Sequence, residues 1–122
     1  MRLNHLDLPV PNVAEARNFY VELLGFVHVE TLGSEGLSIL HDEGGLTLVL
    51  SRRRRTGAQT FPDTFHIGFH LESSEDVSAA YDRLNGAGYA EGPPTLQRGA
   101  FSFYCTGPGE VMVEVAYRPP RT

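Results

Sequence analysis

The sequence predicts a single α+β domain, residues 1–122, in which paired β-α-β-β-β modules form a curled mixed sheet around a cleft. The main observation is an internal repeat in which residues 4–10 (NHLDLPV) match residues 65–71 (FHIGFHL). Both segments alternate polar and apolar residues in the same register, as half-buried strands do. A helical apolar pattern follows each of them, and short glycine-bounded strand patterns follow each helix. Two copies of a module indicate a pseudo-symmetric domain rather than a solenoid.

The first module is predicted over residues 1–51. Its first strand, 3–10, ends at two prolines, and Asn12 can cap the helix that follows. Apolar residues recur at helical spacing as far as Leu24, and Gly25 can end the helix because glycine tolerates a positive φ. Three further strands are predicted at residues 26–32, 37–41 and 46–51.

The polar residues 52–64 are the predicted linker, and the second module is predicted over 65–118. Its strand at 65–71 precedes a helix that Ser73 or Ser74 can cap and that ends by Gly88. The remaining strands are expected at residues 89–91, as a degenerate strand, and at 100–105 and 111–117.

The composition is that of one soluble globular domain, with 41% apolar and 20% charged residues in 122. The first twenty residues lack an apolar signal core, and no apolar run is long enough to span a bilayer, so we expect a cytoplasmic protein. Cys105 is the only cysteine, which excludes an intrachain disulfide and suggests a small buried thiol.

The net charge of −5 disfavours nucleic acid or an anionic membrane as a general partner. All ten basic residues are arginine, and four of them form the run Arg52–Arg55. Such a run is typical of a solvated loop. The alternative is a rim that attracts an anionic substrate, because guanidinium groups suit carboxylates and phosphates.

The strand at 65–71 places His66 and His70 on one face and apolar side chains on the other. His66 could be a hydrogen-bonded wall residue, but the repeat places His5 at the equivalent position of the first module. The apolar strand at 111–117 carries Glu114 at its centre, and an unpaired buried carboxylate is costly. A divalent cation between two imidazoles and this carboxylate would satisfy all three.

Three segments together resemble the vicinal oxygen chelate superfamily: NHLDLPVPN with FYVELLGF after it, FHIGFHLES, and SFYCTGPGEVMVEV. This superfamily includes glyoxalase I, extradiol dioxygenases, fosfomycin resistance enzymes and metal-free bleomycin resistance proteins. The resemblance implies the glyoxalase/bleomycin resistance/dioxygenase fold for the two modules. It also implies that His5, His66 and Glu114 bind a divalent metal ion.

Two departures from the family pattern narrow this expectation. Val49 stands where glyoxalase I has a further ligand, so the sequence predicts a three-ligand site and not glyoxalase I itself. Two histidines and one carboxylate favour Fe²⁺ or Mn²⁺, with Zn²⁺ or Ni²⁺ as alternatives. Glu110 stands where the family often has glycine, and we interpret it as a surface alternative to Glu114.

Three further residues are candidates for catalysis. Asp7 and His70 lie two and four residues beyond His5 and His66 on the inward faces, and Tyr104 lies on the preceding strand. Each could hold a metal ligand in place or transfer a proton, and each could instead be a hydrogen-bonded wall residue. The remaining histidines, His28 and His41, are expected to be structural or solvent-facing.

Three functions therefore remain open. The first is a ring-cleaving dioxygenase or a related lyase or isomerase that chelates neighbouring oxygens of a small substrate. The second is metal-free binding of an antibiotic or metabolite, as in bleomycin resistance proteins. The third is a fosfomycin-type transferase, against which the complete lack of lysine argues. A homodimer is expected, with the metal site either within one chain or shared between two.

Overall fold

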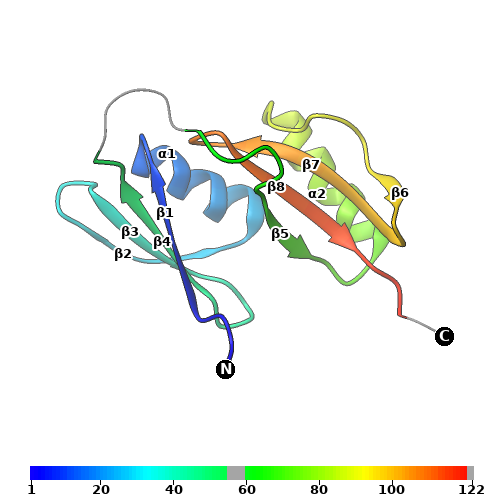
Figure 1. The fold of residues 1–122 in the computed structure, drawn as a ribbon, viewed down its shortest axis with the longest axis horizontal. Helices are drawn as coiled ribbons and strands as arrows, with labels where there is room; N and C mark the ends of the chain where they lie inside the picture. Colours follow the sequence, from blue (N-terminus) through cyan, green and yellow to red (C-terminus); the bar gives the residue numbers. More distant parts are fainter. Residues whose placement is uncertain (55–59, 121–122) are drawn as a thin grey trace. The chain divides into compact units, whose positions relative to one another are not determined.

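The computed structural model describes residues 1–54 and 60–120 (Figure 1). Arg55 and residues 56–59 of the predicted linker lie outside the described residues. The chain divides into two compact units, residues 1–59 and 60–122. Each unit holds one copy of the predicted repeat.

The first unit is a four-stranded mixed sheet with a helical segment on one face (Figure 1). The strand order is β1-β4-β3-β2, in which β1 runs parallel to β4 and the other pairs are antiparallel. Its elements are β1 (His5–Val10), α1 (Val13–Asn18), η1 (Phe19–Leu23), β2 (Val27–Leu32), β3 (Leu37–His41) and β4 (Thr47–Arg52).

The first helical segment begins and ends at the predicted residues but is not one continuous α-helix. The Asn12 side chain accepts a hydrogen bond from the backbone N–H of Glu15 at 3.0 Å, and Gly25 follows the segment with φ at 78°. Between them, α1 passes into the π-helical turn η1 at Phe19. In a π-turn, successive side chains are separated by a smaller angle about the helix axis than in an α-helix. The neighbouring side chains of Phe19 and Tyr20 accordingly both lie on the buried side.

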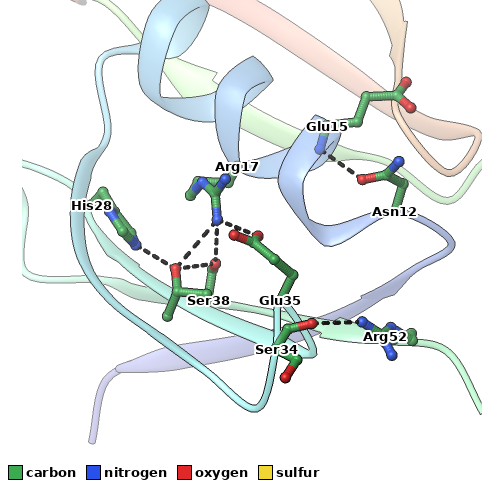
Figure 2. A network of polar contacts seen from close by, with 9 residues as sticks. Asn12, Glu15, Arg17, His28, Ser34, Glu35, Ser38 and Arg52 are labelled. Carbon is green, nitrogen blue, oxygen red and sulfur yellow. Dashed lines mark hydrogen bonds and ion pairs between the residues drawn. The ribbon is translucent and has the colours of Figure 1, made fainter.

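A polar network ties α1 to the hairpin of β2 and β3 (Figure 2). Arg17 on α1 forms an ion pair with Glu35 at 2.6 Å and donates to the hydroxyl oxygens of Thr31 and Ser38. His28 Nε2 lies 2.6 Å from the Thr31 hydroxyl, which in turn contacts the fully buried Ser38 hydroxyl. His28 is thus solvent-exposed and holds the Thr31 hydroxyl, in line with the expectation of a structural or solvent-facing residue.

The second unit repeats the topology of the first, with strand order β5-β8-β7-β6 and a parallel pair between β5 and β8. Ser73 caps its helix by accepting from the backbone N–H of Asp76 at 3.1 Å, as predicted. The elements are β5 (Ile67–His70), α2 (Ser74–Gly86), β6 (Thr95–Gln97), β7 (Ala100–Gly107) and β8 (Val111–Tyr117).

The degenerate strand predicted at residues 89–91 is reduced to a single bridge and does not join the sheet as a full strand. Ala90 makes only an isolated bridge to Cys105, and the edge strand is β6. The reason is the turn at Arg98 and Gly99, where φ values of 51° and 78° form a two-residue hairpin connection directly before β7. Arginine is an uncommon residue for the first position of such a turn, so this hairpin is difficult to predict from the sequence.

The strand registers support the repeat residue by residue. Asp7 on β1 pairs with Val49 on β4, and Gly68 on β5 pairs with Glu114 on β8. Asp7 and Gly68 are equivalent in the internal repeat, so Val49 occupies the first-unit position of Glu114. The predicted equivalence of these two positions is confirmed.

Each unit has its core between its sheet and its helical segment. Helix α1 packs on β3 and β4, and α2 packs on β7 and β8, while alternate strand residues point away from the helices. Cys105 is fully buried on the helical side of β7, and burial raises the pKa of its thiol to about 11. No helix among the described residues is long and apolar enough to cross a membrane.

Replacing the buried Leu84 of α2 by alanine should lower the free energy of unfolding by about 2–5 kcal/mol, because it leaves a cavity against the sheet. Leu96 on β6 is 73% exposed and supplies a control of the same residue type. Leu96→Ala should change stability by no more than about 0.5 kcal/mol. Urea unfolding followed by circular dichroism measures both, and equal losses would contradict the assigned core.

Candidate functional site

The open face of the second sheet carries Glu114 at the centre of β8. Its direct neighbours are Gly68 on β5 and Tyr104 on β7. A side chain at Gly68 would begin 3.9 Å from Glu114 Oε1, so glycine leaves space beside the carboxylate. The Glu114 side chain is 24% exposed, which makes it accessible to a small ligand.

His66 lies immediately before β5 and is held so that one ring nitrogen faces Glu114. Its Nδ1 lies 2.9 Å from the backbone oxygen of Thr64, and a carbonyl can only accept, so Nδ1 carries a proton. Its Nε2 lies 3.3 Å from Glu114 Oε1. If Nε2 is unprotonated, two lone pairs face each other, and only a proton or a cation between them makes the contact favourable. Such an imidazole, fixed through its far nitrogen, has the arrangement of a metal-ligating histidine.

Tyr104 completes this group on the neighbouring strand. Its ring meets the His66 ring edge-on, with centroids 5.8 Å apart. Burial and the negative charge of Glu114, together with a hydrogen bond to that carboxylate, raise the pKa of the Tyr104 hydroxyl above its usual 10.0. The positive charge of Arg98 partly offsets this rise in pKa. The hydroxyl is therefore protonated at neutral pH and can donate to Glu114.

A pocket of about 260 Å³ opens at these three side chains. Its other charged lining residues, Arg98 in the β6–β7 turn and Arg118 after β8, were not predicted from the sequence. The only local signal for Arg98 was the glycine that follows it. The lining residues are His66, Gln97, Arg98, Ala100, Ser102, Tyr104, Glu114 and Arg118.

His70 lies apart from this pocket. It pairs with Ala116 near the far end of β8, and its ring lies 6.3 Å from that of Tyr117. Glu110, the alternative carboxylate, is exposed in the β7–β8 turn with φ at 64°. Of the predicted second-module residues, the structure thus brings together His66, Tyr104 and Glu114.

His5 and Asp7 lie on the open face of β1 in the first unit. His5 is exposed, and its Nδ1 contacts the side-chain oxygen of Asn4 at 3.2 Å. Asp7 accepts a hydrogen bond of 2.6 Å from the Ser51 hydroxyl. It also lines a pocket of about 560 Å³ to which the described part of the arginine run, Arg52–Arg54, contributes.

No group of three or more histidine, cysteine, aspartate or glutamate side chains is placed to hold a metal ion within residues 1–54 and 60–120. The second unit by itself supplies two of the predicted donors, His66 and Glu114. The third, His5, belongs to the first unit.

The model of the Glyoxalase/Bleomycin resistance protein/Dioxygenase superfamily matches residues 2–115. The chain belongs to this superfamily. The match spans both copies of the repeat, and the two copies have the same strand topology. No curated protein sequence gives a significant match.

Solved structures of superfamily proteins have the same fold. A protein from Bacillus cereus described as a possible glyoxalase is 34% identical, with 94% of this chain and 97% of that chain covered and a TM-score of 0.81. A domain from Frankia sp. EAN1pec, described as glyoxylase/bleomycin resistance protein/dioxygenase, is 22% identical over 100% and 95% of the chains, with a TM-score of 0.83. A lactoylglutathione lyase from Agrobacterium tumefaciens is 20% identical over 95% and 92%, with a TM-score of 0.75. The predicted glyoxalase/bleomycin resistance/dioxygenase fold is confirmed.

Replacing Glu114 by glutamine should lower the pKa of Tyr104 toward its usual value, because the negative charge that opposes phenolate formation is removed. Ultraviolet titration of the tyrosines in EDTA-treated protein measures this change. Glu110→Gln is the matched control and should leave the titration unaltered, since Glu110 lies in the exposed turn. An unchanged Tyr104 titration in Glu114→Gln would contradict the contact between the two side chains.

Proposed function

We propose that this superfamily member is a metal-dependent enzyme that acts on a small substrate with two neighbouring oxygen atoms. The observation that carries the proposal is the contact between His66 Nε2 and the Glu114 carboxylate at 3.3 Å, with His66 Nδ1 anchored on the Thr64 carbonyl. This donor pair fits a divalent cation, because an anchored imidazole and a carboxylate converge on one point.

The proposed third ligand is His5. It is the repeat equivalent of His66, it is exposed, and its ring already contacts a side-chain oxygen through Nδ1. We propose that the first unit of the same chain, or of a second chain in a homodimer, supplies it. Two histidines and one carboxylate form a three-ligand site with open coordination positions. Such a site favours Fe²⁺ or Mn²⁺, with Zn²⁺ or Ni²⁺ as alternatives.

The position of Val49 supports a three-ligand site. It pairs with Asp7 as Glu114 pairs with Gly68, and its hydrocarbon side chain cannot bind a metal ion. We therefore favour a ring-cleaving dioxygenase or a related lyase or isomerase over glyoxalase I itself. Because the Bacillus cereus relative is described as a possible glyoxalase, we retain a lyase or isomerase as the alternative to a dioxygenase.

When bound, the cation would act as a Lewis acid toward the two substrate oxygens. The protein would supply the geometry and the protons. Burial and the neighbouring charge of Glu114 raise the pKa of Tyr104, so its hydroxyl stays protonated at neutral pH and would donate a hydrogen bond that orients the Glu114 carboxylate. Asp7 and His70 remain proposed proton-transfer groups, and Asp7 is already oriented by the Ser51 hydroxyl.

Metal binding tests the proposal. Protein stripped with chelator should bind one divalent ion per chain, measured by anaerobic Fe²⁺ or Mn²⁺ titration and elemental analysis. Loss of a residue that only supports a metal ligand typically weakens binding by about 10- to 100-fold, and Tyr104→Phe should weaken it by about this much. Glu114→Gln and His66→Ala remove a ligand itself, so each should weaken metal binding by more than about 100-fold. Glu110→Gln and His28→Ala are the matched controls and should bind as the unaltered protein does.

Wild-type protein that binds no divalent ion would refute the proposal. The remaining function would then be metal-free binding of a small molecule, which the absence of a three-donor group within the described residues would favour. Oxygen uptake by Fe²⁺-loaded protein with catechols separates the reaction types. Uptake is expected for a dioxygenase, and metal binding without uptake would indicate the lyase or isomerase branch.

Mixed dimers test which chain supplies His5. In a site shared between chains, a dimer of one His5→Ala subunit and one His66→Ala subunit keeps one complete set of ligands. In a site within one chain, the same dimer keeps none. About half of the dimers formed by co-refolding equal amounts of the two variants are mixed, and neither homodimer keeps a complete site. Metal content should therefore reach about a quarter of the wild-type value, or about half in isolated mixed dimers, only if the site is shared. A monomer with bound metal in sedimentation would exclude the shared site.

A further inference from the structure

Two arginines give the pocket beside His66 and Glu114 a local positive charge. Arg98 and Arg118 line it, and Glu114 is its only carboxylate lining residue in the described part of the chain. The chain as a whole carries a net charge of −5, so this pocket differs in sign from the average surface. A cationic pocket in an acidic protein attracts an anion selectively to that place.

The Arg118 side chain is held in place by the backbone of the β6–β7 turn. The Arg118 guanidinium donates through Nη1 to the Arg98 carbonyl oxygen at 2.8 Å, which fixes its end at the β6–β7 turn. Gly99 permits this approach, since a Cβ there would come 3.2 Å from the same Arg118 nitrogen and φ is 78°. Arg98 itself lines the same pocket as Arg118, Tyr104 and Glu114.

We propose that Arg98 and Arg118 bind a carboxylate group of the substrate, next to the atoms held by His66 and Glu114. Guanidinium groups bind carboxylates through paired charge-assisted hydrogen bonds, which also fix orientation. The pocket volume of about 260 Å³ suits a ligand of one small ring or less, since pockets for drug-sized ligands have volumes of about 300–1,000 Å³. The substrate class is thus a small carboxylic acid with two neighbouring oxygens, and this last feature rests on the proposed function.

Benzoate and benzyl alcohol, which are alike in size and differ in charge, are suitable probes for metal-free protein. Benzoate should shift the backbone amide resonances of the β6–β7 turn and of Tyr104 in nitrogen-15 correlation spectra, and benzyl alcohol should not. Arg98→Asn removes the guanidinium but keeps a residue that favours the positive φ of the turn. It should weaken benzoate binding by at least about tenfold.

Arg118→Gln provides a second variant, which keeps a donor for the Arg98 carbonyl and should also weaken benzoate binding. Arg83→Ala is the matched control. Arg83 lies on α2, which covers the opposite face of the sheet, so its loss should leave benzoate affinity unchanged.

Three results would overturn the inference. Benzoate could bind Arg98→Asn as tightly as wild type, or it could shift only resonances around Arg52–Arg54 in the first unit. Inorganic phosphate could also bind the β6–β7 turn in preference to benzoate, which would reassign the ligand class. The outcome is separable from the proposed function: metal binding without benzoate binding refutes this inference alone, and benzoate binding without metal binding refutes the metal-dependent reaction alone.

Discussion

The candidate site depends on how the Thr64 carbonyl orients His66. By accepting from Nδ1 at 2.9 Å it fixes the ring proton on that side, so the opposite nitrogen faces Glu114. With the proton on Nδ1, the unprotonated Nε2 and the carboxylate oxygen at 3.3 Å repel each other unless a proton or a cation lies between them. The rest of the pocket is arranged around this requirement, with Gly68 leaving space and Tyr104 donating from the neighbouring strand.

The fold explains why these groups meet although they lie far apart in the sequence. The parallel pairing of β5 with β8 sets the strand that follows His66 beside the strand of Glu114, and the antiparallel pairing of β7 places Tyr104 on its other side. Helix α2 covers the opposite face of the same sheet and buries its apolar side chains there. One face of the sheet therefore supplies stability, and the other is free to carry polar groups.

Much of this could be predicted from the sequence because the signals are local and repeated. Alternation in FHIGFHL and in VMVEVAY placed Glu114 and the strand residues on the correct faces, and the repeat identified Val49 as the equivalent of Glu114. Arg98 and Arg118 were missed because they are 20 residues apart in the sequence, and only the folded sheet brings the β6–β7 turn and the chain beyond β8 together. Alternation also could not predict that His66 lines the pocket and His70 does not, because both histidines lie on the same face of the strand.

The role of His66 in metal binding is tested most directly by long-range proton–nitrogen-15 correlation spectra of the histidine rings during a Zn²⁺ titration. Zn²⁺ is diamagnetic, so the ring signals stay observable. The account predicts that His66 keeps its proton on Nδ1 while its Nε2 resonance moves to the position of a metal-bound nitrogen. A proton that remains on Nε2 at saturating Zn²⁺, or a His66 ring that does not respond at all, would contradict it.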